Sequence, residues 1–275
     1  LDTWAVSYRN DLIENIMPFW MKFGLDRKHG GIYTCLDRDG KLMDSTKSVW
    51  FQGRFGFIAS YAYNHIEKKQ EWLAASKSCI DFIETHCTDI DGHLFFEVTE
   101  EGIPLRKRRY VFSECFAAIA MSEYAIASGD KNYATKALEM FKRILKFLST
   151  PGFLEPKYLP TLQSRGHSIT MILINTASRI REVIEDPVLD RQINESLTSI
   201  RQYFMHPEFK ALLEMVGPKG ELIDTCNGRT INPGHCIETS WFIMEEARHR
   251  NWDKDLVQLA LQILDWSWEW GWDKE

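Results

Sequence analysis

Apolar residues recur along most of the chain at spacings of three and four, the period of an amphipathic α-helix. In the first such stretch, between Trp4 and Phe23, the apolar positions include Leu12, Ile16 and Phe19. The pattern continues in eight further stretches, so nine helices are predicted, with ends defined to within a few residues. The eight further stretches are 49–66, 71–87, 113–128, 131–149, 167–184, 188–204, 234–250 and 253–270.

Short alternating runs that end in turn residues separate some of these helices. Residues 30–41 alternate and close on an Asp-Gly turn, which predicts a β-hairpin, and residues 91–105 repeat the design with a Glu-Gly turn. A unit of two helices joined by a hairpin or loop therefore recurs. Stacked helical pairs form either an open solenoid or a closed ring, and the pattern leaves both open. Because no Pro/Ser-rich linker divides the chain, residues 1–275 are predicted to form one domain.

The summed charge disfavours two classes of partner. Lys and Arg total 33 against 39 Asp and Glu, a formal net charge of -6. Such a field repels phosphate backbones and anionic membrane surfaces, and no apolar run approaches the roughly 20 residues that span a bilayer. Neither a nucleic acid nor a membrane is therefore expected as a partner.

Cysteine usage indicates the compartment. The six cysteines show neither CxxC pairing nor dense spacing, and reduced thiols are the natural interpretation. With no secretory apolar segment at residues 1–10, a cytoplasmic protein is expected. The chain also lacks P-loop, GxGxxG, HExxH and cysteine-rich zinc patterns, so no metal site and no tightly bound nucleotide are predicted.

The strongest candidate chemistry follows Asn232. Pro233 and Gly234 mark a loop, and a helix starts near His235, whose imidazole then lies at the positive end of the helix dipole, where the neutral form is favoured. Glu238 lies three residues further on the same face. A base with an orienting carboxylate suits proton transfer. The alternative is a helix start at which Glu238 caps backbone donors and His235 has no chemical role.

Three other helix starts carry candidate side chains. Gly166 and His167 open an apolar helix, where the alternative is a capped histidine that faces solvent. In a closed ring, such starts would meet at one mouth.

In the second predicted helix, Trp50 and Arg54 lie four residues apart on one face, with Gln52 on another. An arginine in so apolar a helix needs an anion, a hydroxyl-rich ligand or a carboxylate. The alternative is a buried structural ion pair. Tyr110 and Glu114, also four apart, begin the fourth helix.

Several of these motifs together resemble those of the N-acylglucosamine 2-epimerase family, and the match runs over nearly all the chain. The central motif is the run from Asn232 to Glu238. The N-terminal motifs that carry the resemblance are Phe19-Trp20, Gly24-Leu25-Asp26, His29-Gly30-Gly31, Cys35 to Gly40 and Lys47 to Arg54.

The resemblance implies an all-α fold, an (α/α)6 toroid of the six-hairpin glycosidase type with short β-hairpins between helix pairs. Nine helices would fill about three quarters of its twelve. The family's second catalytic histidine lies in the last helices, beyond Glu275. The resemblance therefore implies a chain truncated at its C-terminus, which is not expected to be an active epimerase by itself.

The activity implied is interconversion of N-acetylglucosamine and N-acetylmannosamine, with a small-molecule sugar as the partner. Alternatives within the family are epimerisation of cellobiose or mannose and aldose-ketose isomerisation, and outside catalysis a binding scaffold. The resemblance implies no required cofactor, leaves room for activation by ATP or another nucleotide, and leaves a homodimer open.

By position, the resemblance assigns catalytic roles to His235, Glu238 and Arg54. The residues expected to bind the substrate are Trp50, Gln52, Tyr110, Glu114, His167, Arg229 and Asn232. Trp50, Arg54, His167, His235 and Glu238 are expected to face one cavity at the mouth of the inner helix ring.

Overall fold

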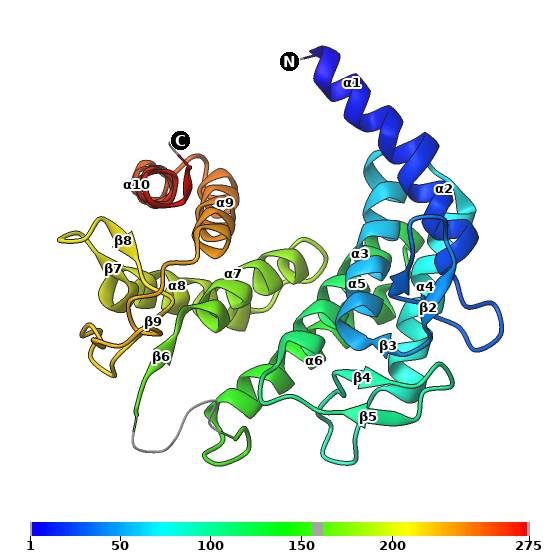
Figure 1. Cartoon of the computed structure of the whole chain (residues 1–275), viewed down its shortest axis with the longest axis horizontal. Coiled ribbons are helices and arrows are strands. Elements are labelled where there is room, and N and C mark those ends of the chain that lie inside the picture. The colour runs from blue at the N-terminus through cyan, green and yellow to red at the C-terminus, as the bar shows by residue number, and fades with distance from the viewer. Residues whose placement is uncertain (1, 156–161, 274–275) are drawn as a thin grey trace. The chain divides into compact units, whose positions relative to one another are not determined.

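The computed structural model describes residues 2–155 and 162–273 (Figure 1). Its contacts gather in two compact units, Leu1–Leu154 (unit 1) and Glu155–Glu275 (unit 2), and each is described by itself. All nine predicted helical segments are present among the described residues, within a few residues of the predicted ends. The helical period thus located the elements correctly.

Unit 1 begins with a continuous helical stretch and continues with two helix pairs. The first stretch consists of α1 (Asp2–Asp11), a π-helical turn (Leu12–Ile16), α2 (Met17–Phe19) and a second π-helical turn (Trp20–Gly24). The pairs are α3 (Val49–His65) with α4 (Gln70–His86) and α5 (Phe112–Ser128) with α6 (Lys131–Ser149). Helix α5 packs on α3, α4 and α6 and is buried without interruption from Ser113 to Ala125, so it forms the centre of the unit.

A glycine sets the distance between α3 and α5. A Cβ atom on Gly53 would lie 2.6 Å from the backbone carbonyl carbon of Phe116. Real Cβ atoms do not approach backbone that closely, so the two helices can cross here only because position 53 lacks a side chain. The same contact holds the N-terminal half of α3, with Trp50 and Arg54, against α5.

We expect Gly53→Ala to lower the free energy of unfolding by roughly 1–3 kcal/mol, because the added methyl forces α3 away from α5. Urea unfolding measures the change. Gly56→Ala is the matched control on the same helix, since its Cβ would meet the Ala120 Cβ at 3.3 Å, and alanine has the higher helix propensity. Equal losses for the two variants would contradict the steric explanation.

The short strands of unit 1 follow the predicted hairpins, with one displacement. Strands β1 (Cys35–Leu36) and β2 (Leu42–Asp44) pair antiparallel. The predicted hairpin was to begin at residue 30, but Gly30 and Gly31 have φ of +86° and +73°, which a strand does not allow. The second hairpin is as predicted, with β4 (Glu97–Val98) and β5 (Pro104–Arg106), and β3 (Lys47–Ser48) adds to it as a third strand.

Unit 2 also consists of two helix pairs. Helix α7 (His167–Arg181) packs on α8 (Pro187–Ser199), which ends in a π-helical turn (Ile200–Phe204), and α9 (Pro233–His249) packs on α10 (Lys254–Gly271). Helices α7 and α9 also contact each other. Two strand pairs, absent from the sequence prediction, connect the helices. They are β6 (Arg165–Gly166) with β9 (Met215–Val216), and β7 (Met205–His206) with β8 (Ala211–Leu212).

Two features bear on the expectations about compartment. All six cysteines are free thiols, and four of them are buried. Among residues 2–155 and 162–273, no helix has both the length and the apolar character that crossing a bilayer requires.

Candidate functional site

Two histidines and a glutamate from three separate segments of unit 2 meet at the start of α7 and α9. His167 is the first residue of α7, Glu214 lies between β8 and β9, and His235 lies in the first turn of α9. The Glu214 Oε2 atom lies 2.9 Å from Nδ1 of His235 and 3.8 Å from Nδ1 of His167. One carboxylate oxygen therefore stands between the two imidazole rings.

The backbone fixes these three residues relative to one another. Strand β6 pairs with β9, with Gly166 opposite Met215 (Figure 1). Next to that pair, the backbone N–H of His167 donates to the Glu214 carbonyl at 3.0 Å, and the Glu214 N–H donates to the Thr230 carbonyl at 3.1 Å. The start of α9 is capped by Asn232, whose Oδ1 accepts from the backbone N–H of His235 at 3.2 Å.

A threonine defines the protonation of His167. The Thr239 hydroxyl donates to the His235 carbonyl at 2.8 Å, as expected for a threonine one turn further along a helix. The same hydroxyl oxygen lies 3.1 Å from Nε2 of His167. Because its only proton is engaged, the hydroxyl accepts here, so the hydrogen-bond network assigns a proton to Nε2 of His167. Nδ1 of His167 then faces Glu214.

Glu214 is ionised at neutral pH. Burial raises its pKa, but the neighbouring imidazoles of His167 and His235 outweigh burial and hold the pKa at about 2. The two histidines differ in access, since the side chain of His235 is 35% exposed and that of His167 only 1%. Only His235 is open enough to meet a ligand directly.

A carboxylate that orients His235 is thus Glu214, and the expected catalytic role of Glu238 stays a prediction. Glu238 is half-buried on α9, and the capping role proposed for it as the alternative belongs to Asn232. Sequence reasoning missed Glu214, although one signal was available. It is the only charged residue in the apolar run from Ala211 to Val216, where an unpaired carboxylate would be costly.

Arg229 lies on the loop between β9 and α9. Its guanidinium forms an ion pair with Asp224, and the side chain is 56% exposed. Asn232 and Arg229 both have partners within the protein, His235 and Asp224 respectively. The expected role of both residues in binding substrate stays a prediction.

In unit 1, Trp50 is the centre of an aromatic cluster. Its ring centroid lies 5.3–5.8 Å from those of the four surrounding rings, and its indole Nε1 is buried without a hydrogen-bond partner among the described residues. The four rings are those of Phe96, Tyr110, Phe112 and Phe116. The guanidinium of Arg54 lies 4.4 Å from the Phe116 ring centroid. Because Arg54 is exposed, the alternative of a buried ion pair is wrong.

Gln52 and Glu114 have structural partners. Both are fully buried. Gln52 bonds both polar groups of the Ile32 backbone, at 2.8 and 2.7 Å. Glu114 Oε1 accepts from the backbone N–H of Leu94 at 2.6 Å and lies 2.5 Å from Nδ1 of His93. These two residues hold neighbouring loops on α3 and α5, a task that the sequence did not indicate, and their expected role in binding substrate stays a prediction.

The residues expected to share one cavity belong to different units. Trp50 and Arg54 lie in unit 1, and His167, His235 and Glu238 lie in unit 2. Each has been placed within its own unit, and their common cavity stays a prediction.

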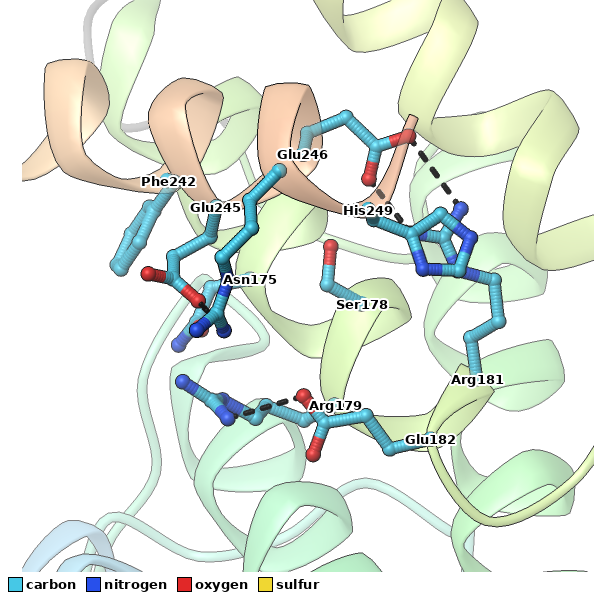
Figure 2. A pocket seen from close by; sticks show the side chains of 10 residues that line it. Asn175, Ser178, Arg179, Arg181, Glu182, Phe242, Glu245, Glu246 and His249 are labelled. Carbon is cyan, nitrogen blue, oxygen red and sulfur yellow. Dashed lines mark hydrogen bonds and ion pairs between the residues drawn. The ribbon is translucent and has the colours of Figure 1, made fainter. Parts of the chain in front are cut away.

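A separate pocket of about 240 Å³ lies between the last turns of α7 and α9 (Figure 2). It is at the opposite ends of these helices from His167 and His235. Figure 2 shows Arg181 of α7 joined to Glu246 of α9. The Nη2 and Oε2 atoms of this ion pair are 2.6 Å apart. Basic residues at helix C-termini offset the helix dipole, so the charge in this pocket already has a structural explanation.

One group in the described part of the chain has the spacing of a cation site. Ligand atoms of Asp26, His29 and Glu100 lie within 4.8 Å of one another. The ammonium of Lys47, however, donates to Asp26 Oδ2 at 2.6 Å and to the Glu100 carbonyl at 2.8 Å. A positive charge of the protein itself already occupies this position, so the group does not fit a metal.

Comparison with known proteins identifies the family. The family model described as N-acylglucosamine 2-epimerase matches residues 31–275. The chain belongs to the N-acylglucosamine 2-epimerase family. The rat N-acylglucosamine 2-epimerase is 29% identical over 283 residues, which cover 100% of this chain and 67% of the relative. A cellobiose 2-epimerase of Ruminococcus albus is 31% identical over 140 residues, 50% of this chain and 36% of the relative.

A solved structure shows the same fold. The cellobiose 2-epimerase of Bacillus thermoamylovorans B4167 matches with a TM-score of 0.87 at 21% identity, over 100% of this chain and 74% of that one. The predicted fold class, all-α of the (α/α)6 type with short hairpins between helices, is confirmed. The chain spans about two thirds of the length of the N-acylglucosamine 2-epimerases it matches, 67% of the rat and 66% of the human protein.

Proposed function

We propose that this protein is a sugar 2-epimerase that interconverts N-acetylglucosamine and N-acetylmannosamine through the C2 proton of the ring-opened sugar. The observation that carries the proposal is His235, a half-exposed imidazole at a helix start whose Nδ1 is held by an ionised carboxylate at 2.9 Å. An N-acylated amino sugar is favoured over cellobiose because the relatives named for it match the whole chain, whereas the cellobiose 2-epimerase of Ruminococcus albus matches 50% of it.

The reaction requires ring opening before proton transfer. The C2 proton is acidic only when C1 is a carbonyl, because the electron pair of the broken C2–H bond then forms the C1–C2 double bond of an enolate whose negative charge develops on O1. A base removes the proton from one face, and an acid returns a proton to the other face. Groups with a pKa near the working pH suit both steps, and His235 is proposed as one of them. The proton transfer requires no cofactor, and ATP or another nucleotide would act as an activator.

The remaining candidate residues would hold the open-chain sugar. Arg54, exposed on α3, is proposed to stabilise the negative charge that develops on O1, as preorganised donors do for other oxyanions. Trp50 and Tyr110 would offer aromatic surface to the sugar, and Glu238 and Arg229 polar contacts. His167, being buried, would act through Glu214.

We expect Arg54→Ala to lower kcat/KM for N-acetylmannosamine roughly 10²-fold, because one donor to the developing charge is lost. Arg54→Lys retains a charge without the planar guanidinium and should lose less. Arg201→Ala removes an arginine that pairs with Asp255 and serves as the control. Initial rates at several substrate concentrations give the three values. Equal kcat/KM in Arg54→Ala and Arg201→Ala would remove Arg54 from the site.

The test of the proposed function is product analysis in D₂O. The full-length protein is incubated separately with N-acetylmannosamine, cellobiose and mannose, and products are identified by NMR. The expected product is N-acetylglucosamine with deuterium at C2. A ketose with deuterium at C1 would indicate an aldose-ketose isomerase. Absence of exchange on all three sugars would favour a binding scaffold and overturn the proposal.

A further inference from the structure

We propose that Glu214 is a positioning residue for His235. Glu214 keeps the imidazole proton of His235 on Nδ1, so that Nε2 is the nitrogen that exchanges a proton with the substrate. The identity of the substrate proton rests on the proposed function. The position of the imidazole proton is a property of the protein alone and can be measured without any sugar.

The assignment follows from what each partner can donate. Glu214 Oε2 and His235 Nδ1 are 2.9 Å apart, a hydrogen-bond distance that requires one proton between them. With a pKa of about 2, Glu214 has no proton to give at neutral pH. The proton therefore belongs to Nδ1, and in the neutral imidazole the basic lone pair is then on Nε2.

The backbone of Glu214 is held on both sides. Its N–H and carbonyl are both engaged, with Thr230 and with the N–H of His167. Strand β9, which pairs with β6, begins at the next residue, Met215. A second residue on a rigid backbone that fixes the ring of an acid–base histidine is the usual arrangement at sites of proton transfer.

His167 meets the same carboxylate from the buried side. Its Nδ1 lies 3.8 Å from Glu214 Oε2, beyond hydrogen-bond reach, and its Nε2–H donates to Thr239. Thr239 in turn bonds the carbonyl of His235. Among the described residues, the titratable groups that face Glu214 are His167 from α7 and His235 from α9, with the buried Cys236 thiol of α9 also within its field.

This arrangement balances charge during the proton transfer. When the C2–H bond breaks, its electron pair enters the enolate and the proton binds Nε2 of His235. The imidazole becomes a cation, with Nδ1–H directed at the ionised Glu214. The carboxylate stabilises that cation. When the reaction runs in the opposite direction, the same nitrogen delivers a proton to C2 from its own face, which restores the neutral ring.

The test is the tautomer of His235, read by long-range ¹H–¹⁵N correlation NMR of the full-length protein with labelled histidine. The His235 signals are assigned by their loss in His235→Gln. We expect the Nδ1–H pattern in the unaltered protein. In Glu214→Gln the neutral amide can offer an N–H to Nδ1, so the Nε2–H pattern should gain population. The kcat for N-acetylmannosamine should fall roughly 10-fold to 10²-fold with KM little changed, as for other residues that orient a functional histidine.

Glu208→Gln is the matched control, because Glu208 pairs with His206 in the same unit, with Oε1 and Nδ1 3.0 Å apart. It should alter the His206 signals and leave the His235 pattern and kcat unchanged. An Nε2–H pattern for His235 in the unaltered protein overturns the inference, even if Glu214→Gln fails to fold. An unchanged His235 pattern in a folded Glu214→Gln also overturns it. An Nδ1–H pattern in a protein that exchanges no sugar proton supports the Glu214–His235 assignment and refutes the proposed function instead.

Discussion

Replacing His235 with alanine is expected to slow exchange of the C2 proton of N-acetylmannosamine by about 10²–10⁴-fold, the usual contribution of a general acid–base group. The methyl group cannot accept or return a proton, so the substrate loses its proposed partner in the transfer. Deuterium incorporation at C2, followed by NMR in D₂O, measures the rate.

The fold should survive this substitution. The Asn232 cap bonds the backbone N–H of residue 235, which alanine retains, and the side chain that is removed is 35% exposed. Far-ultraviolet circular dichroism and the urea midpoint check this. His249→Ala, an exposed histidine at the other end of the same helix, is the matched control and should exchange at the rate of the unaltered protein. Deuterium uptake by His235→Ala at that same rate would remove His235 from the mechanism.

The helices were predictable because each buries one face, and the apolar residues of that face recur in the sequence at the helical period. Helix α6, for example, buries Tyr133, Ala137, Phe141 and Ile144 at intervals of three and four. The π-helical turns on either side of α2 were not predicted. They flank Pro18, which lacks an N–H and so disrupts the regular bonding of the helix there.

The candidate site was predictable only in part, because its decisive partner is non-local. The spacing of His235 and Glu238 suggested a pair on one helix face, yet the carboxylate that contacts His235 lies 21 residues away. The pairing of β6 with β9 places Glu214 beside His167, and its backbone bond to Thr230 holds it beside the segment that leads into α9. Contacts as short as these leave no periodic signal. A short-range pattern can locate a functional histidine, but it does not identify the group that orients it.

Buried polar residues in apolar helices raised a related difficulty. Gln52 and Glu114 both needed partners, and a ligand was one explanation. In the structure, backbone groups of Ile32 and Leu94 are the partners instead. The sequence shows that a buried polar side chain must be satisfied, but it does not show whether a loop or a substrate satisfies it.

The Lys47 ammonium is a buried charge on which unit 1 depends. Its side chain is fully buried, and Nζ donates to Asp26 Oδ2 at 2.6 Å and to the carbonyls of Gly30 and Glu100 at 2.8 Å each. The Phe82 ring centroid lies 4.3 Å away. Two loop segments, before β1 and after β4, therefore converge on the cation at the start of β3.

We expect Lys47→Met to lower the free energy of unfolding by roughly 3–5 kcal/mol at pH 7, because Asp26 is left as a buried charge without its partner and two carbonyls lose their donor. Urea unfolding measures the loss. Lys107→Met is the matched control, since Lys107 also bonds two carboxylates, Asp89 and Asp91, but at the surface. Exposed pairs contribute at most about 1 kcal/mol, so similar losses in the two variants would contradict the special role of Lys47.

The pH dependence of stability gives an independent check on the same pair. Burial raises the pKa of Asp26, but the bond from Lys47 and those from the backbone of His29 and Lys28 hold it at about 2, below the ordinary 3.8. A depressed carboxyl pKa stabilises the folded state above the unfolded value and loses that effect as pH falls through the folded one. The unaltered protein should therefore lose stability between about pH 4 and pH 2. In Lys47→Met the stability lost between pH 4 and pH 2 should be smaller, because the pKa of Asp26 rises towards or above its unfolded value. An identical pH profile in the two proteins would show that Lys47 does not lower the pKa of Asp26.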